Sequence, residues 1–200
     1  MSQPKNSIWV FADYRNYFQN RVTLQLLAKA NDLATGMNAE VCAVVFGHET
    51  DEYVAEYIAH GAQKVLVVKH PSLNRYSVEK FTFLMEKLAG DQGPEIILIG
   101  ATSFGREFAP RVAKRLGTGL TADCIGLEMT SEGHLLQIAP SFGGNLIAEI
   151  ITPDHRPQMA TVRPGTFQEL PHDNTRCGDI VPIPLPKKIP PDRLRLVAYE

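Results

Sequence analysis

The chain has 200 residues, of which 44% are hydrophobic and 21% charged, and its formal net charge is −2. This balance is typical of a globular protein and gives no reason to expect nucleic acid or a membrane surface as a partner. The three cysteines lie far apart without a CxxC pair, so we expect no structural metal site. No apolar run approaches the ~20 residues that span a bilayer, and the first residues lack a signal-peptide core. We therefore expect a cytoplasmic protein.

Strand and helix patterns alternate over the first part of the chain. Short apolar runs predict strands at 7–12, 40–46, 64–68 and 95–100. The helical spacing of apolar residues predicts helices at 22–37, at 51–60, after Ser77 and at 106–116. Strands that are apolar throughout and joined by helices predict a parallel sheet with helices on both faces.

The pattern changes after Gly119. Strand-like segments without intervening helices follow at 121–128, 135–140, 145–152 and 158–162. Turn signals between them predict antiparallel hairpins added to the sheet. A proline-rich stretch at 171–191 predicts an extended arm, and 193–199 is again strand-like. We expect a domain at 1–168 and an arm or linker at 169–200.

The segment 100–106 (GATSFGR) follows the fourth expected strand, where α/β sheets commonly bind ligands. Thr102 can cap a helix, Gly105 permits close approach of the backbone, and Arg106 could bind an anion at the helix N-terminus. The spacing matches neither GxxxxGK[ST] nor GxGxxG, and Pro110 predicts that the helix kinks or begins late. An anion-binding turn and a capped helix start with an exposed arginine therefore both remain open.

Further along, three features have both a structural and an interface interpretation. Arg111, together with Lys114 and Arg115, gives the expected helix a basic face that either faces solvent or binds a partner. Asp123 interrupts an apolar strand, and such a carboxylate needs a partner, which either Arg163 or the amide groups of a nearby loop could supply.

The third feature is the segment 140–150 (PSFGGNLIAEI), in which Gly143, Gly144 and Asn145 predict a sharp backbone reversal or a bulge. This segment is either a turn with an edge strand or an interface. Catalytic constellations are missing, because the sequence contains no GxSxG, HExxH or paired-carboxylate signature. We therefore expect no catalytic residue and no metal ligand.

Taken together, three ordered motifs resemble the α subunit of electron transfer flavoprotein. They are residues 100–124 (GATSFGREFAPRVAKRLGTGLTADC), 142–145 (FGGN) and 156–165 (RPQMATVRPG), and the early segment VFADYRN is similar to the family's opening strand and loop. The resemblance implies an adenine-nucleotide α-hydrolase-like three-layer fold with a mostly parallel sheet and added antiparallel strands.

The resemblance also implies a two-domain parent protein. In that family the C-terminal domain of the α subunit binds FAD, and a β subunit completes a heterodimer. The chain ends about where the flavin domain is expected to begin, so no flavin contact can be assigned to these residues. The resemblance thus implies a scaffold that supports electron transfer from acyl-CoA dehydrogenase-type enzymes, as in fatty acid β-oxidation, to an acceptor. On this interpretation Arg106 and Arg111 are candidates for ion pairs between domains or subunits.

A second hypothesis is a stand-alone adenine-nucleotide-binding domain of the α-hydrolase-like class. Such a protein would use Asp13 and the turn at 102–106 to bind adenosine phosphates. The fold implied above permits this activity, but fold alone does not establish function.

Overall fold

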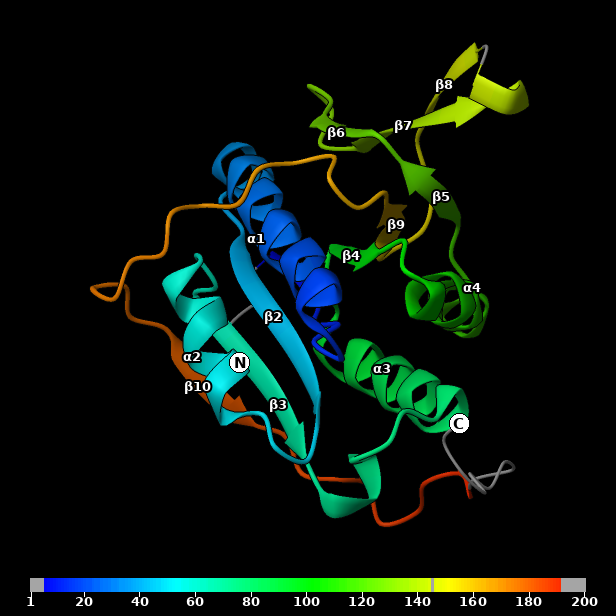
Figure 1. The fold of residues 1–200 in the computed structure, drawn as a ribbon. Coiled ribbons are helices and arrows are strands. Elements are labelled where there is room, and N and C mark those ends of the chain that lie inside the picture. Colours follow the sequence, from blue (N-terminus) through cyan, green and yellow to red (C-terminus); the bar gives the residue numbers. More distant parts are fainter. Residues whose placement is uncertain (1–5, 145, 192–200) are drawn as a thin grey trace.

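The computed structural model describes residues 6–144 and 146–191. Its main body is a sheet with helices on both faces, and a smaller sheet projects from one end (Figure 1). The expectations for Asn145 and for the strand at 193–199 fall outside the described residues. The three-layer α/β architecture agrees with the fold expected from the sequence.

Seven strands form the main sheet in the order β10-β3-β2-β1-β4-β9-β5, and every neighbouring pair is parallel. The strands are β1 (Ser7–Phe11), β2 (Glu40–Gly47), β3 (Lys64–Lys69), β4 (Ile96–Gly100), β5 (Leu120–Cys124), β9 (Gln158–Val162) and β10 (Asp179–Pro182). The central strands are buried along their whole length, which explains why their sequences are apolar on both faces.

Two helices cover each face of this sheet. They are α1 (Tyr17–Met37) and α2 (Asp51–Ala59) on one face, and α3 (Val78–Gln92) and α4 (Ser103–Leu116) on the other. Alternate residues of β1 divide between the two cores: Ile8 and Val10 face α1, and Trp9 and Phe11 face α3 and α4. A short 3₁₀ turn, η1 (Pro71–Leu73), connects β3 to α3.

Two helices begin earlier than the apolar pattern indicates. The side chain of Asn16 accepts a hydrogen bond from the Gln19 N–H, so α1 begins at Tyr17 rather than at Val22. Thr102 caps α4 in the same way, and the helix runs from Ser103 through Pro110. The expectation of a late start is therefore wrong, because the missing N–H of Pro110 removes one internal hydrogen bond without ending the helix.

The antiparallel strands form a sheet of their own. It contains β6 (Gly126–Met129), β7 (Leu135–Ser141) and β8 (Leu146–Ile150) in that order, and the short turn η2 (Phe142–Gly144) joins the last two. The single strand expected at 121–128 is divided between the two sheets after Cys124, and Asp123, with a φ of 58°, lies in a bulge near the end of β5. Strand β9 does not form a hairpin either, because it returns to the main sheet between β4 and β5.

The proline-rich arm packs against the domain. Drawn in orange in Figure 1, it runs from β9 past α1 to the far edge of the sheet, where β10 pairs with β3. Asp179 and Ile183 donate backbone N–H groups to this pairing, so strand alternation places Pro182 on the free edge. Proline has no N–H to offer there, and the edge is protected against pairing with another strand.

Candidate functional site

The crevice at the carboxyl ends of β1 and β4 is the place where open α/β sheets bind ligands, because the strand order reverses there. Asp13 follows β1 and is only 5% exposed. Its Oδ2 atom accepts hydrogen bonds from the Thr102 hydroxyl at 2.8 Å and from Nη2 of Arg15 at 2.9 Å. The Arg15 guanidinium also lies 4.3 Å from the centre of the Phe104 ring. The Asp13 carboxylate at the crevice is thus paired within the chain, and a cavity of about 730 Å³ lined by Tyr14, Arg15 and Thr50 opens next to it.

The start of α4 packs very closely on the end of β4. The Thr102 hydroxyl accepts the Gly105 N–H at 3.0 Å, which satisfies one of the free N–H groups of the helix. A Cβ atom on Gly105 would lie only 1.8 Å from the carbonyl oxygen of Gly100. Gly105 therefore permits a close approach of the backbone, as expected from the sequence, and the group that approaches it is the Gly100 carbonyl rather than a ligand.

Three of the candidate residues come together at the end of β5. Asp123 Oδ2 accepts hydrogen bonds from Nη2 of Arg163 at 2.6 Å and from its Nε at 3.2 Å. Nη2 of Arg106 lies 4.0 Å from the other carboxylate oxygen of Asp123. The bond with Asp123 raises the pKa of Arg163, so this arginine stays charged. One carboxylate between two arginines leaves a net positive cluster on the surface, and the Arg106 side chain is 65% exposed.

The remaining candidates lie elsewhere. Arg111 is one turn further along α4 and pairs with Glu107 at 3.8 Å. Gly143 and Gly144, with φ values of 70° and 91°, form the reversal between β7 and β8 that the sequence indicates. This reversal is at the tip of the small sheet and does not join the cluster around Asp123 (Figure 1).

The small sheet ends in an exposed apolar edge, within the segment 140–150 for which the sequence left a turn with an edge strand and an interface both open. Four large aliphatic side chains are exposed on β8 or just after it: Leu146, Ile147, Ile150 and Ile151. Ile147, the most exposed of them at 65%, alternates with Leu146 along the strand, so both faces of β8 are apolar. The signal in the sequence was the lack of polar alternation in LIAEII. An apolar strand that projects into solvent is typical of a protein-binding surface.

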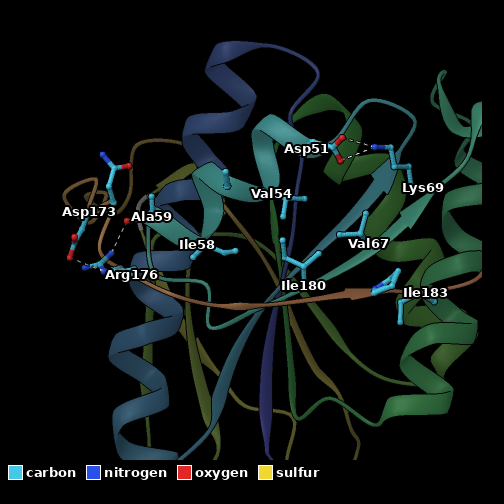
Figure 2. Close-up of a pocket in the computed structure, with 13 residues that line it drawn as sticks. Asp51, Val54, Ile58, Ala59, Val67, Lys69, Asp173, Arg176, Ile180 and Ile183 are labelled. Atoms are coloured by element: carbon cyan, nitrogen blue, oxygen red, sulfur yellow. Dashed lines mark hydrogen bonds and ion pairs between the residues drawn. The ribbon is translucent and has the colours of Figure 1, made fainter.

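A groove beside α2 is the second uncovered apolar area (Figure 2). It has a volume of about 640 Å³ and lies where β10 extends the sheet beyond the cover of α2. Val54, Ile58 and Ile180 converge in its middle, and Ile180 is 58% exposed. Lys69 is at one end, with its Nζ 2.7 Å from Asp51, and Arg176 donates to the Ala59 carbonyl at the other.

These features define an α/β domain whose crevice carries a carboxylate paired within the chain and whose surface carries apolar and charged patches. The chain belongs to the electron transfer flavoprotein domain family, which it matches over residues 8–188. Among the described residues, no helix combines the length and the apolar character needed to cross a membrane.

Curated relatives agree with this family. The chain is 45% identical over 174 residues to an electron transfer flavoprotein subunit alpha of Thermoanaerobacterium thermosaccharolyticum, covering 87% of this chain and 53% of the relative. It is 44% identical over 173 residues to the protein of that name in Clostridium acetobutylicum, covering 86% and 52%. It is also 39% identical over 173 residues to the lactate dehydrogenase (NAD(+),ferredoxin) subunit LctC of Acetobacterium woodii, covering 86% and 41%. The chain thus spans about half the length of the curated relatives it matches.

Proposed function

We propose that the chain is the N-terminal scaffold domain of an electron transfer flavoprotein α subunit, with its boundary near residue 168 and an arm from 169 onward. Its role is to hold the β subunit and the FAD domain in place while electrons pass between partner enzymes. The observation that carries this proposal is the match to α subunits along nearly all of this chain and about half of theirs.

On this proposal the complete α subunit binds FAD through its C-terminal domain, and the residues of this chain do not contact the flavin. The start of α4 supports this assignment, because the Asp13 carboxylate accepts a hydrogen bond from the capping Thr102 and so places a negative charge at the helix end that would otherwise attract a diphosphate. Acyl-CoA dehydrogenase-type flavoenzymes are the proposed electron donors. Relatives named as subunits of a lactate dehydrogenase and of an acryloyl-CoA reductase favour a wider choice of donor.

The apolar strand β8 is the proposed contact with the β subunit. Burying one large aliphatic side chain in an interface contributes roughly 1.5–3 kcal/mol. Ile147→Lys should therefore weaken binding to the co-expressed β subunit by about tenfold or more, measured by co-purification and titration calorimetry. Ile180→Lys is the matched control, since Ile180 is similarly exposed but lies on β10. Equal binding by both variants would remove β8 from the interface, and failure of the unsubstituted chain to bind any β subunit would count against the scaffold role itself.

The cluster of Arg106, Asp123 and Arg163 is the proposed polar contact between domains or subunits. Arg106→Ala should weaken β-subunit or FAD-domain binding with little effect on folding, because the side chain is exposed and its partner oxygen is 4.0 Å away. The same variant tests the nucleotide-binding alternative. Calorimetry of the chain with AMP, ATP and FAD should show no binding tighter than about 100 μM, which corresponds to roughly 5.5 kcal/mol. Micromolar AMP binding that Arg106→Ala abolishes would favour the alternative.

A further inference from the structure

A basic surface covers the neighbouring helices α3 and α4 and the end of the arm. Its cations come from three separate segments of the chain: Lys87, Arg111, Lys114, Arg115, Lys187 and Lys188. We call this set the α3–α4 surface. All six side chains are exposed. The helices lie side by side on one face of the sheet, and the arm passes α3 after β10 (Figure 1).

The surface is continuous, because two shallow clefts meet at Arg115. The first has a volume of about 600 Å³ and is lined by Phe83, Pro186 and the nearby lysines. The second has a volume of about 350 Å³ and lies between α3 and α4 at Pro110. Arg115 lines both clefts, and its Nη1 atom lies 2.7 Å from Glu86 Oε2.

Most of the positive charge on this surface is not neutralised. Only Arg115 has a close ion pair, and Arg111 is 3.8 Å from Glu107. The four lysines of the surface have no ion pair among the described residues. The cations therefore outnumber the neighbouring carboxylates, although the whole chain has a net charge of −2. Such local excess attracts a partner of opposite charge and speeds its association.

The second cleft also contains an unused polar group. Thr82 lines this cleft, is only 2% exposed, and its hydroxyl has no hydrogen-bond partner among the described residues. A buried hydroxyl without a partner costs roughly 1–3 kcal/mol. A carboxylate or backbone carbonyl inserted between α3 and α4 would accept this hydrogen bond.

We propose that the α3–α4 surface docks an acidic segment of a protein partner. Carboxylates of that segment pair with Lys114, Lys187 and Lys188, and an apolar side chain between them fits beside Phe83 in the first cleft. This inference goes beyond the scaffold function and does not depend on it.

The details of the surface favour an acidic protein segment over other polyanions. Glu79 and Glu86 lie between the cations, where they would repel the continuous phosphate backbone of a nucleic acid. The apolar groups Phe83 and Pro186 line a concave cleft, whereas insertion into a lipid surface needs apolar side chains that protrude. A flexible acidic peptide can place its carboxylates around both glutamates.

The test measures fluorescence anisotropy of a labelled peptide that alternates glutamate with phenylalanine and leucine. The 200-residue chain should bind it saturably and more weakly as salt is raised. Lys114→Gln/Lys187→Gln should weaken binding by about fivefold or more, since each exposed pair contributes roughly 0.5–1 kcal/mol. The control Lys29→Gln/Lys69→Gln makes the same change of charge away from this surface and should bind like the unsubstituted chain.

Two sets of results overturn the proposal. One is equal loss of peptide affinity in both double variants, which would show attraction by overall charge alone. The other is tighter binding, at equal salt, of a single-stranded RNA of the same length or of vesicles containing phosphatidylserine. Because Lys114 and Lys187 are exposed, urea unfolding of Lys114→Gln/Lys187→Gln should match the unsubstituted chain within about 0.5 kcal/mol.

Discussion

Substitution of Gly105 by alanine tests the close contact between α4 and the end of β4. The new Cβ would lie 1.8 Å from the Gly100 carbonyl oxygen, whereas carbon and oxygen atoms normally stay about 3.3 Å apart or more. The first turn of α4 must therefore move by about 1.5 Å. That displacement strains the Thr102 cap and the hydrogen bond that Thr102 donates to Asp13.

The size of the effect follows from these contacts. Overpacking in a close-packed region costs about 1–3 kcal/mol, and loss of a helix cap costs about 1 kcal/mol. A hydrogen bond to a buried charge contributes roughly 1.5–3 kcal/mol, and part of it is lost as well. The better helix propensity of alanine offsets about 1 kcal/mol. We expect Gly105→Ala to lower the free energy of unfolding by about 3 kcal/mol, and Tm by roughly 6–12 °C for a chain of this size.

Urea unfolding followed by circular dichroism measures this difference directly. Gly90→Ala is the control, because Gly90 lies in α3 and a Cβ there meets no atom within 4 Å. The control should be more stable than the unsubstituted chain by about 0.5–1 kcal/mol. If Gly105→Ala were as stable as Gly90→Ala, the close packing of α4 on β4 would be refuted.

Three further predictions concern the cap, the thiols and the edge strand. Thr102→Val should lower the free energy of unfolding in urea by about 2 kcal/mol, because it removes the helix cap and the hydrogen bond to Asp13. Thr102→Ser keeps the hydroxyl and should stay within about 0.5 kcal/mol of the unsubstituted chain. Equal losses in the two variants would mean that packing at this position, and not the hydroxyl, stabilises the fold. Burial raises the pKa of Cys42 and Cys124 to about 12, so Ellman's reagent at pH 8 should react rapidly with the exposed Cys177 alone, and with all three thiols after unfolding. Because the folded-state pKa of the two buried thiols is raised, their contribution to stability should be complete below about pH 9 and should decline as the pH rises toward 12. Urea unfolding at a series of pH values measures this decline. Ile180→Lys should leave stability within about 0.5 kcal/mol, and a larger loss would mean that the groove beside α2 is packed in solution.

Local signals in the sequence predicted much of the fold. The first four strands are apolar throughout, and each is followed by a helix, so the parallel sheet with two helical layers could be expected. The place of β9 could not be predicted. Its sequence, QMATV, fits a hairpin strand as well as a buried parallel one, and only the long-range pairing with β4 distinguishes them. The bulge near the end of β5 could not be predicted either, because it contains a positive φ at Asp123, which is rare for a residue with a side chain.

The candidate site was predictable only in part. The need of Asp123 for a partner was predictable, and of the two alternatives, Arg163 or the amides of a nearby loop, the structure shows Arg163. The nucleotide-binding hypothesis placed Asp13 with the turn at 102–106, but it did not predict that Thr102 and Arg15 would bind the Asp13 carboxylate directly, because the Thr102 contact joins residues 89 positions apart. For the segment that contains β8 the sequence left an edge strand and an interface both open, and the exposure of its apolar side chains depends on the tertiary structure.

The position of β9 has a consequence for synthesis of the chain. Strand β5 has only β9 as a neighbour in the main sheet, yet β9 is translated after the whole of the small sheet. Until residue 162 has left the ribosome, β4 therefore presents an unpaired edge, and β5 has nothing to pair with. Nascent chains that stop before β9 should consequently be targets for chaperones and proteases, whereas chains that reach residue 162 can complete the central sheet.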